Sequence, residues 1–183
     1  IWFTSAPDQL KGDALTMAQR CQEAGVPMQA LTADALPHGA DLLVDGLLGT
    51  GLKGPLRDDV AMLLRALNAL SIPVMALDVP SGLSADSGMP LGAVLQAEMT
   101  CTFIGLKRGL LTGEGPLHCG VLRFFDLQVS RNIYAQVQPD SVSPSAELLQ
   151  QCLPARRVDG HKGDYGHVSV SYTHLRAHET SRY

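Results

Sequence analysis

Two short apolar runs, each of which ends at an aspartate, constrain the fold more than any other feature of the sequence. The first covers residues 41–45 and ends at Asp45, and the second covers residues 73–78 and ends at Asp78. A short, nearly continuous apolar run is typical of a strand that is buried on both faces of a parallel sheet. A carboxylate followed by a glycine-containing loop marks the end of such a strand. The sequence therefore predicts two parallel strands, each with a carboxylate at its carboxyl end.

Helical patterns alternate with further strand patterns along the chain. Apolar residues recur at steps of three and four from Leu10 to Ala24, which predicts an amphipathic helix that ends at Gly25. A second helix is predicted after Pro55, with the apolar stripe Val60, Leu63, Leu64, Leu67 and Leu70. Further strands are expected at residues 1–4, 28–31, 100–105 and 120–127. This alternation predicts an α/β, Rossmann-like three-layer sandwich with a mainly parallel sheet and helices on both faces.

Charge and hydropathy narrow the class of protein. The net charge is −4 over 183 residues, and no basic stripe indicates a nucleic-acid surface. No apolar stretch approaches the ~18 residues of a membrane span. The cysteines form no C-x-x-C pair, so we expect reduced, structural thiols and a cytoplasmic protein. They are Cys21, Cys101, Cys119 and Cys152.

The loop after Asp45 has the composition of a ligand-binding loop. Gly49, Gly51 and Gly54 allow a close approach of backbone to ligand and can present several amides to a phosphate. Lys53 could add a positive point charge. A plain strand-to-helix turn with a solvated lysine is the alternative. The occurrence of a second such loop after Asp78 favours a ligand site, because ligands of open parallel sheets bind outside the carboxyl ends of the strands.

Asp78 itself is followed by Val79 and Pro80, and the proline stiffens the turn that sets the direction of the aspartate. A carboxylate at a partly desolvated strand end is suited to proton transfer. The alternative is an aspartate that caps a helix or a turn. Ser81 could cap a helix, bind a ligand or offer its oxygen to a hard cation, and the sequence does not rank these roles.

Three runs of residues, 41–54, 74–88 and 102–113, resemble successive blocks of the YjeF N-terminal family of NAD(P)H-hydrate (NAD(P)HX) epimerases, and the resemblance covers residues 1–129. It implies an isomerase that interconverts the R and S epimers of hydrated NADH and NADPH for nucleotide repair. It implies K⁺ as cofactor, with Asp45 and Ser81 as metal ligands, and Asp78 as the catalytic, substrate-contacting carboxylate. The substrate-binding loop that it implies consists of Gly49, Thr50, Gly51, Leu52, Lys53, Gly54 and Pro55. The expected partners are NADHX and NADPHX, without nucleic acid or membrane, and a homo-oligomer is left open.

The same resemblance suggests how the chain is divided. Residues 1–130 are expected to be a partial epimerase domain, whose asparagine- and glycine-rich phosphate loop would precede Ile1. Residues 131–157 are expected to be a linker with a short helical stretch at 147–152. Residues 158–170 are similar to the opening of an NAD(P)HX dehydratase domain, and residues 171–183 are predicted to be a non-native tail. We therefore expect a fragment of a bifunctional protein that could be inactive by itself.

Two other functions are alternatives to the epimerase. A non-catalytic YjeF-like module for dimerisation or scaffolding would be expected to lose its strand-end carboxylates, whereas Asp45 and Asp78 are both present. A generic dinucleotide-binding domain of an oxidoreductase is disfavoured, because no G-x-G-x-x-G opens a helix with an acidic residue ~20 positions later. The sequence therefore favours the enzyme.

Overall fold

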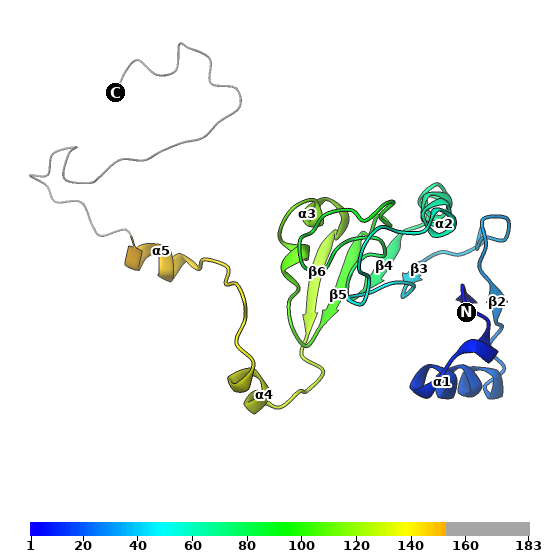
Figure 1. Cartoon of the computed structure of the whole chain (residues 1–183), viewed down its shortest axis with the longest axis horizontal. Helices are drawn as coiled ribbons and strands as arrows, with labels where there is room; N and C mark the ends of the chain where they lie inside the picture. Colours follow the sequence, from blue (N-terminus) through cyan, green and yellow to red (C-terminus); the bar gives the residue numbers. More distant parts are fainter. Residues whose placement is uncertain (153–183) are drawn as a thin grey trace, which may run out of the picture. The chain divides into compact units, whose positions relative to one another are not determined.

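The computed structural model describes residues 1–152, and the chain divides into two compact units (Figure 1). The first unit is Ile1–Gln138 and holds both sheets. The second begins at Pro139, and its described part holds the helix α5 (Ala146–Cys152). This helix confirms the helical stretch expected near residues 147–152. The predicted dehydratase opening and tail, residues 158–183, lie outside the described residues.

The strands of the first unit are short and all the predicted ones are present. Their bounds are β1 Trp2–Phe3, β2 Gln29–Ala30, β3 Leu43–Asp45, β4 Val74–Leu77, β5 Met99–Phe103 and β6 Val121–Phe125. The helices are η1 Pro7–Gln9, α1 Gly12–Glu23, α2 Asp58–Asn68, η2 Arg108–Leu110, α3 Gly115–His118 and α4 Arg131–Gln136. The short helix α4 was not predicted and lies within the expected linker, where Ser130 caps its first turn by accepting a hydrogen bond from the amide of Asn132.

The pairs between the named strands of residues 1–152 are parallel, in agreement with the mainly parallel sheet that was predicted. The main sheet has the order β3-β4-β5-β6, and its register pairs Asp45 with Ala76 and Leu77 with Cys101. Strands β1 and β2 form a second, two-stranded parallel sheet instead of extending the first. Side-chain packing joins the two, because Leu31, next to β2, is buried in the core that covers β4. The α/β class expected from the sequence is therefore confirmed.

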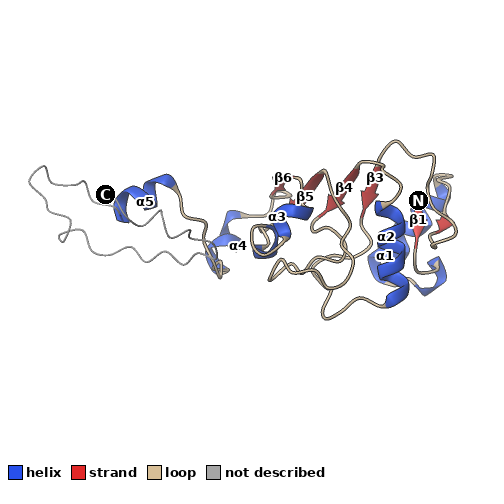
Figure 2. Ribbon diagram, turned by 90° about the horizontal axis from the view of Figure 1, so that it is seen from above, coloured by secondary structure: helices blue, strands red, loops and turns tan. Residues whose placement is uncertain are grey.

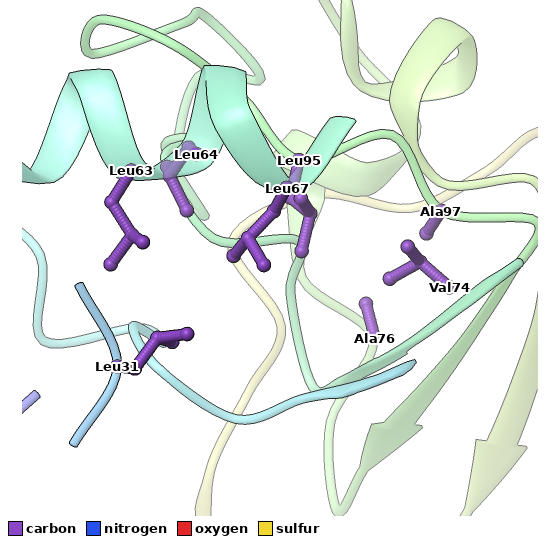
Figure 3. Close-up of a cluster of buried hydrophobic side chains, with 8 residues drawn as sticks. All are labelled: Leu31, Leu63, Leu64, Leu67, Val74, Ala76, Leu95 and Ala97. Atoms are coloured by element: carbon purple, nitrogen blue, oxygen red, sulfur yellow. The ribbon is translucent and has the colours of Figure 1, made fainter. Parts of the chain in front are cut away.

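The core of this unit forms between α2 and one face of the main sheet. Figure 3 shows Leu63, Leu64 and Leu67 of α2 turned toward Val74 and Ala76 of β4. The other two residues of the predicted stripe, Val60 and Leu70, are partly buried against the same cluster, which Leu31, Leu95 and Ala97 complete. Burial of each leucine contributes about 1.5–3 kcal/mol, so this face holds β4 in place beneath α2.

The two faces of the main sheet differ in what covers them. Figure 2 shows α2 and α3 on the same side of strands β3 to β6. On the opposite face, Val44, Leu77, Val121 and Phe125 are exposed, and no described helix covers them. The described residues thus give the sheet and one helical layer of the expected sandwich. No helix among residues 1–152 is long and apolar enough to cross a bilayer.

Candidate functional site

The carboxyl ends of β3, β4 and β5 lie along one edge of the main sheet. Because the strands are parallel and paired in register, Asp45 at the end of β3 and Asp78 directly after β4 reach the same edge. Thr102 and Phe103 end β5 beside them. This is the edge at which open parallel sheets bind ligands, and it is where the sequence placed both carboxylates.

Asp45 and Ser81 are buried and in direct contact. The Ser81 hydroxyl donates to Asp45 Oδ1 at 2.6 Å, and the Ser81 amide donates to Asp45 Oδ2 at 2.8 Å. The amide of Leu47 donates a third hydrogen bond, to Oδ1 at 3.2 Å. Burial nevertheless raises the pKa of the Asp45 carboxyl, because its desolvation outweighs these hydrogen bonds. No cationic side chain of the described residues pairs with Asp45.

Leu48 adds a third residue to this contact. Its amide donates to the Ser81 hydroxyl oxygen at 2.9 Å, and its carbonyl oxygen lies 3.3 Å from the same hydroxyl. A carboxylate, a hydroxyl and a carbonyl thus converge, and oxygen atoms are the ligands that hard cations take. A buried carboxylate without a cationic partner also leaves negative charge for such an ion to offset. The residues therefore fit the K⁺ that the family resemblance implies, although potassium binding itself stays a prediction.

The glycine-containing loop that follows is anchored at both ends and exposed between them. Leu48 is held by Ser81, and the Leu56 amide donates to the Leu91 carbonyl at 2.7 Å. Within the loop, the Leu52 amide closes a turn on the Gly49 carbonyl at 3.1 Å. The other loop amides donate no hydrogen bond to any residue of the described chain; they belong to Gly49, Thr50, Gly51, Lys53 and Gly54. Amides in this state are available to an anion.

Lys53 and Pro55, the remaining residues of the predicted loop, are exposed. Lys53 forms no ion pair with a described residue and does not contact Asp45 or Asp78. A hollow of about 200 Å³ lies at the opposite end of β4, beside Pro73 and Val74. At the ligand edge, the hydrogen-bond donors lie on the loop and the carboxylates at the strand ends.

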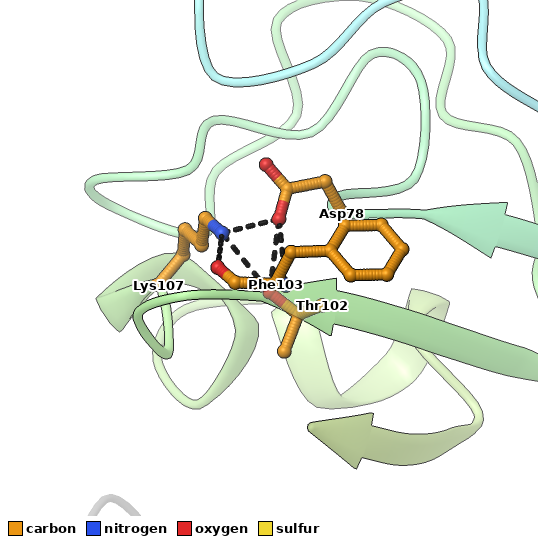
Figure 4. A network of polar contacts seen from close by, with 4 residues as sticks. All are labelled: Asp78, Thr102, Phe103 and Lys107. Carbon is orange, nitrogen blue, oxygen red and sulfur yellow. Dashed lines mark hydrogen bonds and ion pairs between the residues drawn. The ribbon is translucent and has the colours of Figure 1, made fainter. Parts of the chain in front are cut away.

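Asp78 is held by the end of the neighbouring strand, not by a helix or by its own loop. Its Oδ1 accepts hydrogen bonds from the Phe103 amide at 3.1 Å and from the Thr102 hydroxyl at 3.2 Å. The same oxygen is paired with the ammonium group of Lys107 (Figure 4). Ser81 likewise precedes no helix. The helix-cap alternatives that the sequence left open are therefore wrong for both residues.

Lys107 and Thr102 are site residues that sequence reasoning missed. The Lys107 ammonium also donates to the Phe103 carbonyl at 2.7 Å and to the Thr102 hydroxyl at 3.2 Å. Both residues lie in the run 102–113 that resembles the family, and the signal available was a lysine five residues after a threonine near the end of a strand. Their convergence on Asp78 depends on the path of the chain between them, which the sequence pattern does not reveal.

Two tight turns of the same kind follow β4 and β5. Asp78 has φ of +72°, and the amide of Val79 donates to the carbonyl of Leu77 at 2.9 Å across it. Ile104 has φ of +63°, and the amide of Gly105 donates to the carbonyl of Phe103 at 2.6 Å. A three-residue turn with positive φ at its centre is rare and strained, most of all for a β-branched residue such as isoleucine. Strain of this kind clusters at functional sites.

Known proteins with sequences similar to this chain have names that refer to NAD(P)H-hydrate. The family described as YjeF-related protein N-terminus matches residues 1–109. The bifunctional NAD(P)H-hydrate repair enzyme Nnr of Vibrio cholerae is 36% identical over 170 residues, which is 93% of this chain and 34% of that protein. The NAD(P)H-hydrate epimerase of Legionella pneumophila (strain Paris) is 34% identical over 134 residues, 73% of this chain and 50% of that protein. The chain thus spans about a third to a half of the length of these two relatives.

The strained turn at Ile104 can be tested by comparison with a regular strand position. Ile104→Gly should leave the free energy of unfolding nearly unchanged, because relief of about 1–2 kcal/mol of left-handed strain offsets the lost side chain and the entropy of glycine. Val121→Gly in β6, with a similarly exposed side chain, should lower it by about 1 kcal/mol or more. Equilibrium urea unfolding measures both values. Equal losses in the two variants would contradict strain at Ile104.

Proposed function

The chain belongs to the family of YjeF-related protein N-termini, and on that basis we propose that it is the epimerase part of an NAD(P)H-hydrate repair enzyme. Its substrates would be NADHX and NADPHX, and its product the opposite epimer at the hydroxyl-bearing carbon of the reduced ring. The observation that carries this proposal is Asp78, a carboxylate at the ligand edge with Oδ1 fully engaged and Oδ2 without a hydrogen bond from any described residue.

The free oxygen of Asp78 suits the chemistry of the reaction. Epimerisation of a carbon that carries a hydroxyl group requires one bond at that carbon to break and re-form. A carboxylate beside the ring can take the hydroxyl proton as the carbonyl bond of an aldehyde forms and the ring carbon–nitrogen bond breaks, and can pass that proton to the nitrogen. The reverse steps on the other face of the aldehyde give the opposite epimer, and the carboxylate can also hold the ring while this happens. Asp78 is the residue we assign to this task. A non-catalytic scaffold would have no need of a carboxylate held in this way.

The rest of the edge would hold the charged part of the nucleotide. The free amides of residues 49–51, 53 and 54 can donate to the pyrophosphate, and Lys53 can add its charge there. K⁺ on Asp45, Ser81 and Leu48, when bound, would supply a fixed positive charge that offsets both Asp45 and the phosphates. Asp45 and Ser81 already hold the loop in place through Leu48. We place this activity in the cytoplasm, where nicotinamide nucleotides are used.

Replacement of Asp78 by asparagine tests its role in the complete protein. Asp78→Asn should slow the exchange of the R and S epimers at least ~100-fold, because asparagine cannot take up the proton. An epimer-resolved chromatographic assay, corrected for the uncatalysed exchange, measures the rate. Asp86→Asn in the same loop changes an exposed aspartate and should retain the full rate. Wild-type exchange by Asp78→Asn would remove Asp78 from the mechanism.

Binding of a monovalent cation can be measured without reference to activity. Thallium(I) is a stand-in for K⁺, and equilibrium dialysis of the complete protein should show one ion that competes with K⁺ and depends on Asp45. Asp45→Asn should weaken its binding at least ~10-fold, because the amide keeps one oxygen and loses the charge. Asp59→Asn on the exposed start of α2 is the matched control. Equal binding by both variants would place the ion elsewhere.

A further inference from the structure

We propose that Lys107 is a positioning residue of this site, which fixes Oδ1 of Asp78 so that Oδ2 alone meets the hydrated ring. The inference rests on the proposed function and adds to it the group that orients the catalytic carboxylate. Four features of the described residues support it: the donors of Lys107, the acceptors of Asp78, the burial of the pair, and the loops that seat Lys107.

The ammonium group of Lys107 has every proton engaged. Its three donors meet three acceptors, namely Asp78 Oδ1, the Thr102 hydroxyl and the Phe103 carbonyl. No proton is left for a substrate atom while these contacts hold. Lys107 therefore acts on the reaction through Asp78 and not as an acid toward the ring.

The two oxygens of Asp78 are consequently distinct. Oδ1 receives three donors, from Lys107, Thr102 and the Phe103 amide, whereas Oδ2 receives none from the described chain. In Figure 4 the engaged oxygen points to this group and the other points away from it. The carboxylate cannot turn about its last bond without breaking all three contacts. Its free oxygen is thus held in one direction, as a near-attack geometry requires.

The side chains of Lys107 and Asp78 are largely buried, which stabilises the orientation of the Asp78 carboxylate. The side chains of Lys107 and Asp78 are 17% and 26% exposed to solvent. Hydrogen bonds between charged groups are stronger than neutral ones, and a partly buried pair is less screened by salt than a surface pair. A fully exposed pair would fluctuate among many geometries; this one has a defined position between the ends of β4 and β5.

The backbone seats Lys107 against the loop that follows Asp78. The Lys107 carbonyl accepts from the Leu110 amide in η2, and the Gly109 amide of η2 donates to the Ala85 carbonyl at 2.7 Å. A Cβ atom on Gly109 would lie 2.1 Å from the Ser84 carbonyl oxygen, so only glycine allows this approach. The loops after β4 and β5 are therefore packed backbone to backbone. Lys107 connects the two loops through its ion pair with Asp78.

The test is a steady-state comparison in the complete protein with both epimers as substrates. Lys107→Met keeps the aliphatic stem and removes the charge. We expect kcat to fall ~10- to 100-fold, since a misplaced reacting group has an effect of this size. KM should stay within about threefold, because the nucleotide is held by another loop. Lys11→Met, an exposed lysine before α1, should leave both constants unchanged.

Chemical rescue separates positioning from a general structural role. Lys107→Cys treated with 2-bromoethylamine acquires a thioether side chain with an ammonium group at the reach of lysine, and kcat should recover. Wild-type protein treated in the same way controls for its own cysteines. Lys107→Arg should not recover kcat, because a planar guanidinium cannot point at three acceptors gathered around one nitrogen.

If circular dichroism shows that Lys107→Met does not fold, Thr102→Val is a second variant that tests the inference. It removes one donor to Oδ1 and one acceptor of Lys107, so kcat should fall less than in Lys107→Met while KM is again kept. Wild-type kcat in the folded lysine variant, or in Thr102→Val when the lysine variant is unfolded, would overturn the inference. A rise in KM alone would overturn it too, and would make Lys107 a substrate-binding residue. Absence of epimer exchange in the wild type would instead refute the proposed function.

Discussion

The buried contact between Asp45 and Ser81 fixes the geometry of the ligand edge. It joins the end of β3 to the loop after β4 through two hydrogen bonds of 2.6 and 2.8 Å. Ser81 also holds the Leu48 amide, and its carbonyl accepts from the Leu95 amide at 2.9 Å, which ties the loop to the core. Since Asp78 lies three residues before Ser81, the contact also determines where Asp78 leaves its strand. Loss of this contact would free both loops together.

The two strand-end carboxylates occupy different environments and are suited to different work. Asp45 is buried among oxygen atoms without a cationic side chain of the described residues, and burial raises the pKa of its carboxyl. Asp78 is only partly buried, is paired with Lys107 and keeps one oxygen unengaged. The first environment favours a bound cation that compensates the charge, and the second favours a carboxylate that faces a substrate. Chemically identical side chains are thus differentiated by their neighbours.

Much of the fold could be predicted from the sequence, because apolar runs and periodic stripes report burial directly. The end of β3 at Asp45, the end of β4 directly before Asp78, and the buried stripe of α2 follow from that pattern. The pairing of Asp78 with Lys107 could not be predicted. It depends on positive φ angles at Asp78 and Ile104, and neither residue is a glycine that would mark such a turn. The separate sheet of β1 and β2 also depends on tertiary packing, which local sequence patterns do not report.

The proposed mechanism depends most on the different roles of the two oxygens of Asp78. A crystal structure of the complete protein with hydrated NADH bound would test it most directly. We predict the ring hydroxyl within about 2.6–3.2 Å of Oδ2, with Oδ1 still held by Lys107, Thr102 and the Phe103 amide. A ring bound to Lys107 itself, or to Oδ1 after the ion pair has opened, would contradict the account.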